Sequence, residues 1–317
     1  MMPHNNPTSV SAVVGNRLRF RRGRGASGIA KALGAPALMS SNAKGLLAHD
    51  HPLNAGGMLF GAGQRDLLRR ADIVLSLGAE FGDTEWTFYT DEPPQIGGIL
   101  IRVDIDADQL DRNIKPDLAI QADATAFAEA LLGALNRPPA PMADLGACAE
   151  APAIDLAENY TRHLSMIEAL WTAHPDAILV GDSAEPSYTA TCAGRAPGPR
   201  QWFTGSTGFG TLGYALPAAI GAQIARPDAP VIALAGDGGA LYTIPELAAA
   251  AEAGAPVILL IWNNDGYGDL AIGWGNADVR QRDDDAGRLL LVSGKEIIAA
   301  RARGENLEPS RMVPTPQ

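Results

Sequence analysis

The most restrictive feature of the sequence is a stretch at residues 229–268 in which two apolar runs each end in polar residues. The runs, 229–235 and 256–262, have the length and composition of buried strands. Residues 245–253 lie between them and have the pattern of a helix, because a proline opens the segment and a glycine follows it. The stretch therefore predicts a strand, a helix and a second strand that runs parallel to the first.

Polar residues follow both predicted strands. Asp237 lies in Gly-Asp-Gly-Gly, which we interpret as a turn, and Asn264 lies in Asn-Asn-Asp-Gly-Tyr-Gly. Parallel strands end at the same edge of a sheet, so these two side chains are expected to converge. Carboxylate and amide oxygens suit Mg²⁺, and the neighbouring glycines let backbone N–H groups approach phosphate oxygens. Taken separately, either piece is more simply interpreted as an ordinary tight turn.

Elsewhere, short apolar runs alternate with helical patterns, as in α/β proteins. Strands are expected near 35–39, 73–78 and 99–105, a helix near 63–70, and a second α/β unit from about 177. Parallel strands buried on both faces read as apolar runs of this kind. The predicted fold is thus α/β, with two doubly wound parallel-sheet domains.

Changes in composition divide the chain into five expected segments. A Pro-rich and then Ala/Gly-rich stretch interrupts both periodicities and reads as an interdomain linker. The segments are a poorly ordered or divergent N-terminus (1–29), a first domain (30–135), the linker (136–160), a second domain (161–270) and a divergent tail (271–317).

Composition narrows the class of partner. The net charge of -11 disfavours nucleic acid and anionic membranes, whose surfaces would repel the chain. No apolar run approaches the roughly 20 residues that a membrane-spanning helix needs. The two cysteines have no metal-binding or redox spacing. We therefore expect a cytoplasmic protein that acts on small molecules.

In combination, the polar strand ends of 229–268 resemble the diphosphate-binding signature of thiamine-diphosphate-dependent enzymes. This resemblance implies that Asp237, Asn264 and the carbonyl of Gly266 hold Mg²⁺. It also implies that Gly238 and Gly239 line the diphosphate of thiamine diphosphate.

A second stretch, residues 208–222, resembles the segment that bends the cofactor into a V shape in the same family. The resemblance implies that the carbonyl of Gly210 accepts a hydrogen bond from the cofactor's 4′-amino group and that Leu212 lies between its two rings. The alternative for Leu212 is a core residue at the entrance of a helix. Asp182 and Ser183 follow an apolar run and either reach the diphosphate or serve as turn and cap residues.

Four stretches of the first domain, residues 41–47, 51–53, 71–78 and 102–107, resemble the central domain of the acetolactate synthase and 2-oxoacid decarboxylase group. Within that group, Asn-Ala-Lys-Gly at 42–45 and Trp-Asn-Asn-Asp-Gly-Tyr-Gly at 262–268 look most similar to 5-guanidino-2-oxopentanoate decarboxylase. Some members bind FAD in this domain. The sequence argues against FAD here, since Gly61-Ala-Gly63-Gln lacks the third glycine of a dinucleotide fingerprint.

Members of this family also carry an N-terminal pyrimidine-binding domain, whose glutamate activates the cofactor. No such context is found here, so we expect a fragment truncated at both ends, with no catalytic residue of its own. Two functions remain open. The chain is either a component of a decarboxylase or carboligase that is inactive alone, or a non-catalytic remnant or assembly protein. The first implies a 2-oxoacid substrate and either a homo-oligomer or a partner chain that supplies the missing domain.

Overall fold

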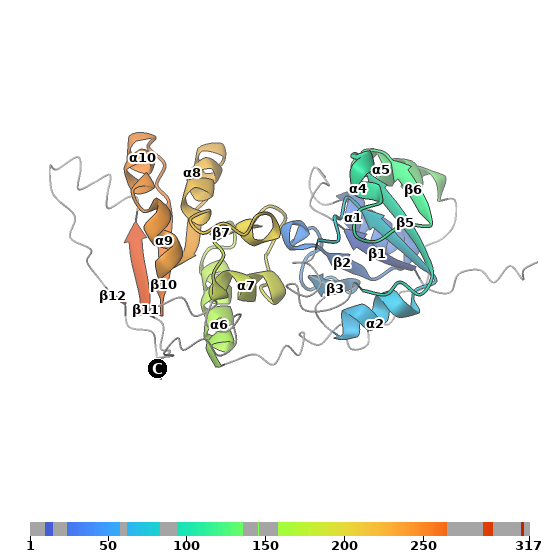
Figure 1. Ribbon diagram of the computed structural model, residues 1–317, viewed down its shortest axis with the longest axis horizontal. Helices are drawn as coiled ribbons and strands as arrows, with labels where there is room; N and C mark the ends of the chain where they lie inside the picture. Colours follow the sequence, from blue (N-terminus) through green and yellow to red (C-terminus); the bar gives the residue numbers. More distant parts are fainter. Residues whose placement is uncertain are drawn as a thin grey trace, which may run out of the picture. The chain divides into compact units, whose positions relative to one another are not determined.

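The computed structural model describes residues 10–14, 24–57, 62–82, 94–135, 145, 158–264, 288–293 and 312–313. The chain forms two compact units. The first comprises Met1–Asp155 with Arg195–Arg200, and the second comprises Leu156–Gly194 with Gln201–Gln317. Each unit contains its own sheet and its own helices (Figure 1).

The first unit is built on a parallel sheet whose order among the described strands is β3-β2-β1-β4-β5-β6. The strand bounds are β1 (Val10–Val14), β2 (Ala37–Met39), β3 (Asn54–Gly57), β4 (Ile73–Leu77), β5 (Ile99–Asp104) and β6 (Leu118–Gln121). The helices are α1 (Arg24–Leu33), α2 (Ala62–Arg70), α4 (Ala107–Leu110) and α5 (Ala124–Ala134). This strand order is the one found in dinucleotide-binding folds, although a fold by itself does not establish a ligand.

Helices cover both faces of the first sheet, as the sequence predicted. Alternate strand residues such as Met39, Leu77 and Val103 pack in one core with α1 and α5, while Leu38 and Val74 pack in another with α2. Figure 1 shows α2 on one side of this sheet and α1 and α5 on the other. Because neighbouring residues of a strand point to opposite faces, apolar runs such as Ile73–Leu77 supply both cores.

The second unit has a sheet of order β12-β11-β10-β9-β7-β8 among its described strands. The bounds are β7 (Ile178–Gly181), β8 (Trp202–Thr204), β9 (Val231–Gly236), β10 (Ile258–Asn263), β11 (Arg288–Ser293) and β12 (Met312–Val313). The helices are α6 (Glu158–Ala173), α7 (Glu185–Cys192), α8 (Ala215–Ala225), α9 (Asp237–Thr243) and α10 (Glu246–Glu252). Strands β7 to β10 are parallel, whereas β11 and β12 extend one edge in antiparallel pairing.

This sheet is also covered on both faces. Val231, Ala233 and Ala235 of β9 pack with residues of α8, α9 and α10. On the other face, Trp262 of β10 meets His163 of α6, and Gly181 of β7 lies against Ser187 of α7. The predicted α/β class with doubly wound parallel sheets is therefore confirmed, with the antiparallel edge as an addition.

Two details of the predicted chain path were wrong. Residues 1–29 were predicted to be a poorly ordered or divergent N-terminus, yet Val10–Val14 forms β1 between β2 and β4, and α1 begins at Arg24. The segment Gly-Asp-Gly-Gly at 236–239 is not a turn, because Asp237 is the first residue of α9. Glycine is a poor helix former, so Gly238 and Gly239 favoured a turn, but Ala240–Thr243 continues the helix.

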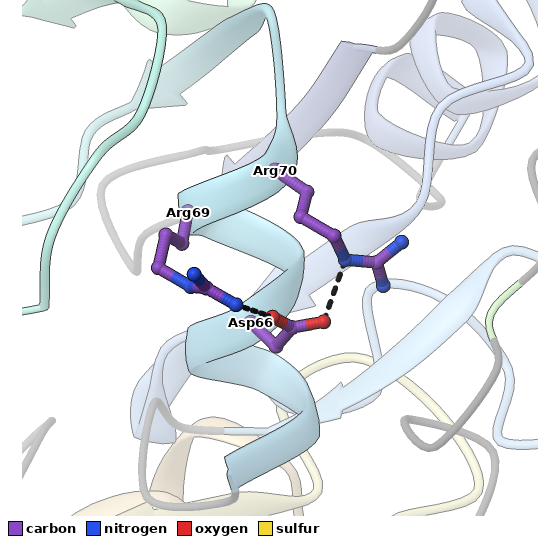
Figure 2. Close-up of polar contacts among 3 residues, drawn as sticks. All are labelled: Asp66, Arg69 and Arg70. Atoms are coloured by element: carbon purple, nitrogen blue, oxygen red, sulfur yellow. Dashed lines mark hydrogen bonds and ion pairs between the residues drawn. The ribbon is translucent and has the colours of Figure 1, made fainter.

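Helix α2 of the first unit carries a small group of charges on its exposed side. The carboxylate of Asp66 accepts hydrogen bonds from Arg69 and Arg70, each at 2.5 Å (Figure 2). These bonds lower the pKa of Asp66, which is consistent with pairs spaced three and four residues apart on a helix. In water such pairs contribute little to the free energy of folding.

Among the described residues, every helix is too short or too polar to span a bilayer.

Candidate functional site

The candidate site lies at the carboxyl ends of the parallel strands in the second unit. The chain leaves β7 toward β8 on one side and leaves β9 toward β10 on the other, so the strand order reverses between β7 and β9. In open α/β sheets, ligands bind in the crevice beyond the strand ends at such a reversal. Asp182 directly follows β7 and Asp237 directly follows β9, which places both acidic residues at this point.

Asp182 is held by backbone donors. Its side chain is only 1% exposed, and its two carboxylate oxygens accept from the N–H of Gly213 at 3.0 and 2.9 Å. The carboxylate also accepts from the N–H of Ser183 at 2.8 Å. Burial raises the pKa of Asp182, and the backbone N–H groups that surround the carboxylate oppose this rise. The carboxylate thus fastens the end of β7 to the loop at residues 208–214.

The loop at 208–214 has a conformation that depends on glycine. Gly210 and Gly213 have φ angles of 63° and 83°, in the left-handed region that other residues rarely adopt. Leu212 between them is 36% exposed, so it is not a core residue of the described chain. The alternative interpretation of Leu212 was therefore wrong. Its role between the cofactor rings stays a prediction.

Helix α9 begins at the edge where the sequence analysis expected a diphosphate. The first N–H groups of a helix have no acceptor within that helix, and here they belong to Asp237, Gly238 and Gly239. A Cβ on Gly239 would lie 3.0 Å from Oδ2 of Asp182, so the backbone of α9 approaches this carboxylate closely. Asp182 and Gly239, which were predicted separately, are therefore neighbours.

The end of β10 lies beside the start of α9. Trp262 of β10 is paired with Gly236 of β9, so the residues that follow these two, among them Asn264 and Asp237, continue from adjacent strands. Gly266, the third predicted magnesium ligand, lies outside the described residues. Across the described ranges, no three His, Cys, Asp or Glu side chains are gathered to hold a metal ion. The predicted ligands are of a different kind: one carboxylate, one amide and one carbonyl.

Ser183 lies next to the same loop. Its Oγ is buried and has no hydrogen-bond partner among the described residues. A Cβ on Gly210 would be 3.8 Å from this oxygen, so Ser183 and Gly210, both predicted site residues, are close to each other. A buried hydroxyl without a partner costs free energy unless a ligand or a water molecule completes its bonding.

Two residues of this arrangement, Gly213 and Thr243, were not predicted from the sequence. Thr243 ends α9 and donates from its Oγ1 to the carbonyl of Gly213 at 3.0 Å. Gly213 stands in the glycine-rich stretch that the sequence analysis singled out. Nothing in the sequence around Thr243 distinguishes it from other threonines near a helix end.

Two family models match the chain. The model described as "Thiamine pyrophosphate enzyme, central domain" matches residues 10–131, and "Thiamine pyrophosphate enzyme, C-terminal TPP binding domain" matches residues 186–285. The first match includes the strand β1 that the sequence analysis overlooked. The second includes the loop at 208–214, α9 and the end of β10.

Similar proteins include decarboxylase and synthase chains. The probable 2-ketoarginine decarboxylase of Pseudomonas aeruginosa is 38% identical over 260 residues, which are 78% of this chain and 45% of that protein. The acetolactate synthase isozyme 1 large subunit of Escherichia coli is 34% identical over 242 residues, or 74% of this chain and 42% of that protein. The aligned part of the chain therefore spans less than half of each of these relatives.

Proposed function

Because this chain belongs to the thiamine pyrophosphate enzyme family, we propose that its second unit binds thiamine diphosphate together with Mg²⁺. We further propose that the chain is a component of a 2-oxoacid decarboxylase or an acetolactate-synthase-like carboligase. The observation that carries the proposal is the meeting of the ends of β7 and β9 with the loop at 208–214 where the strand order reverses.

At the diphosphate end, Asp237, Asn264 and the carbonyl of Gly266 would hold the metal, and Gly238 and Gly239 would line the phosphates. Two features of the structure fit this assignment. Gly239 has no side chain to collide with Asp182, so the backbone of α9 can begin at this edge, and the hydroxyl of Ser183 lacks a partner among the described residues. A hydroxyl of this kind can donate to a phosphate oxygen.

At the ring end, the carbonyl of Gly210 would accept from the 4′-amino group, and Leu212 would support the bent form of the cofactor. The partial exposure of Leu212 supports this role, because an apolar side chain outside the core is available to contact a ligand. Thiamine diphosphate, when bound, supplies an electron sink for the loss of CO₂ from a 2-oxoacid. The residues of this chain bind and orient it.

The substrate and partners are proposed on the same basis. A 2-oxoacid is the shared substrate class, and the similarity to a 2-ketoarginine decarboxylase makes 5-guanidino-2-oxopentanoate the first acid to test. Phe209 and Tyr242, on two segments that meet at the bond between Gly213 and Thr243, are 101% and 65% exposed. Exposed aromatic side chains beside the candidate site suit cover by a second copy or by a partner chain that carries the pyrimidine-binding domain. A cytoplasmic location and the absence of FAD stay predictions.

Calorimetry tests the proposed function directly. The chain should bind thiamine diphosphate in the presence of Mg²⁺ and lose this binding when EDTA removes the metal, because Asp237 and the phosphates would otherwise repel each other. Restoring Mg²⁺ in excess of EDTA is the matched control and should restore binding. Equal affinity with and without EDTA would rule out the metal bridge. No binding under either condition would favour a non-catalytic remnant or assembly protein.

A further inference from the structure

Gly213 is held on both sides of its peptide backbone by side chains from different segments. Its N–H donates to the carboxylate of Asp182 at 2.9 and 3.0 Å, and its carbonyl accepts from Oγ1 of Thr243 at 3.0 Å. Asp182 lies 31 residues before Gly213 and Thr243 lies 30 residues after it. The end of β7 and the end of α9 are thus joined through one glycine.

A direct role of Asp182 at the diphosphate fits the structure less well. An ionised carboxylate only accepts hydrogen bonds, and so do phosphate oxygens, so the two cannot bond without a proton or a metal between them. The oxygens of Asp182 already receive the N–H groups of Ser183 and Gly213. Asp182 is also almost completely buried, so a metal ion arriving from solvent has no access to its carboxylate.

We propose that Asp182 and Thr243 are positioning residues that clamp Gly213 and so fix the loop carrying Gly210 and Leu212. This inference rests on the proposed function, because Gly210 and Leu212 are the residues assigned there to the ring end of the cofactor. The clamp adds that ring recognition depends on two side chains that do not themselves touch the cofactor. A loop held in its bound conformation loses less freedom on binding, which raises affinity.

The clamp makes a prediction that separates the two ends of the cofactor. Thr243→Val keeps the shape of the side chain and removes the donor to Gly213, and Asp182→Asn replaces one acceptor oxygen by an amino group. Both changes should weaken thiamine diphosphate, by about 3- to 10-fold for Thr243→Val and about 10- to 100-fold for Asp182→Asn. Both should weaken the binding of Mg²⁺ with inorganic pyrophosphate, which lacks the rings, much less.

The experiment is calorimetric titration of the full chain with each ligand in excess Mg²⁺, with pyrophosphate also measured by competition. Thr243→Ser retains the hydroxyl and should restore the affinity of the unaltered chain. Asp66→Asn makes the same chemical change as Asp182→Asn on an exposed helix of the other unit, and it should alter neither affinity. Thermal melting of each variant checks that it is folded. If Asp182→Asn fails to fold, Thr243→Val alone decides.

The possible outcomes of these titrations distinguish the clamp from a direct role at the diphosphate. Selective loss of thiamine diphosphate affinity supports the clamp. Equal losses for both ligands would place Asp182 or Thr243 at the diphosphate or metal and overturn the clamp, and unchanged affinities for both would also overturn it. If the unaltered chain binds neither ligand, the proposed function fails instead, and the clamp fails with it.

Discussion

The imidazole of His163 packs edge to face against the indole of Trp262, with ring centroids 4.5 Å apart. The contact joins α6 to β10, the strand that directly precedes Asn264. Nδ1 of His163 also lies 3.2 Å from Oγ1 of Thr189, whereas its Nε2 has no partner among the described residues. A neutral imidazole is stable in this apolar position, whereas a protonated and charged imidazole is not.

The first prediction concerns the dependence of stability on pH. Burial lowers the pKa of His163 from 6.5 to about 4 in the folded state, so the unfolded chain binds the proton first as pH falls. The free energy of unfolding should therefore decrease between pH 6.5 and about 4, by up to roughly 3 kcal/mol from this residue. Urea denaturation across this range measures it.

His163→Gln should flatten this part of the pH profile, whatever its effect at neutral pH. His174→Gln is the matched control, since His174 follows the same helix but is exposed. A profile equally steep in His163→Gln and in the unaltered chain would mean that other groups cause the loss of stability.

The second prediction tests packing behind the candidate site. Gly181 is the last residue of β7, and a Cβ there would lie 2.6 Å from Oγ of Ser187 and 2.7 Å from the buried ring of Trp202. Both neighbours are themselves buried, at 0% and 1% exposure, so Gly181→Ala should destabilise the fold by about 1–3 kcal/mol. Gly221→Ala, in the middle of α8 where nothing lies within 4 Å, should instead stabilise it by roughly 0.5–1 kcal/mol. Loss of stability in both variants would contradict the steric argument.

The sequence predicted most of both sheets because buried parallel strands leave a strong local pattern. β4, β5, β9 and β10 appear as apolar runs that end in glycine or polar residues. β1 was missed because its five residues, Val-Ser-Ala-Val-Val, stand just before an arginine-rich stretch and resemble a strand only once β2 and β4 are placed beside them. The place of β1 between β2 and β4 depends on how the whole sheet pairs, which a local sequence pattern does not encode.

The candidate site was predicted in part for the same reason. Asp182 and Asp237 were found because each follows a strand, and topology then brings such residues together. The hydrogen bonds of Gly213 to Asp182 and Thr243 span about thirty residues in each direction, so no local sequence pattern predicts them. The start of α9 at Asp237 was also hidden, because two consecutive glycines favour a turn on propensity alone.

A third prediction separates the two consecutive asparagines after Trp262. Asn263 is the last residue of β10, whereas Asn264 follows the strand, and Asp237 is the proposed charged ligand. Asp237→Ala should weaken Mg²⁺–thiamine diphosphate by about ten- to a hundredfold, because a charge-assisted contact is worth roughly 1.5–3 kcal/mol. Asn263→Ala should have a much smaller effect in the same titration. Similar losses would mean that the roles of the two asparagines are assigned wrongly.

The last prediction concerns activation of the cofactor. The resemblance to the family implies that a glutamate in a pyrimidine-binding domain activates the ring, and the family models that match this chain are those of the central and C-terminal domains. The purified 317-residue chain, saturated with Mg²⁺ and thiamine diphosphate, should therefore exchange the thiazolium C2 proton no faster than free cofactor does. NMR in D₂O follows this exchange, and calorimetry on the same sample confirms that the cofactor is bound. Co-expression with a separate chain that carries the pyrimidine-binding domain should accelerate exchange and give aldehyde from a 2-oxoacid.

Rapid exchange in the chain alone would mean that one of its own carboxylates activates the ring. Glu185, at the start of α7 and three residues after Asp182, would then be the first to change, and Glu185→Gln should abolish the exchange if that carboxylate is responsible.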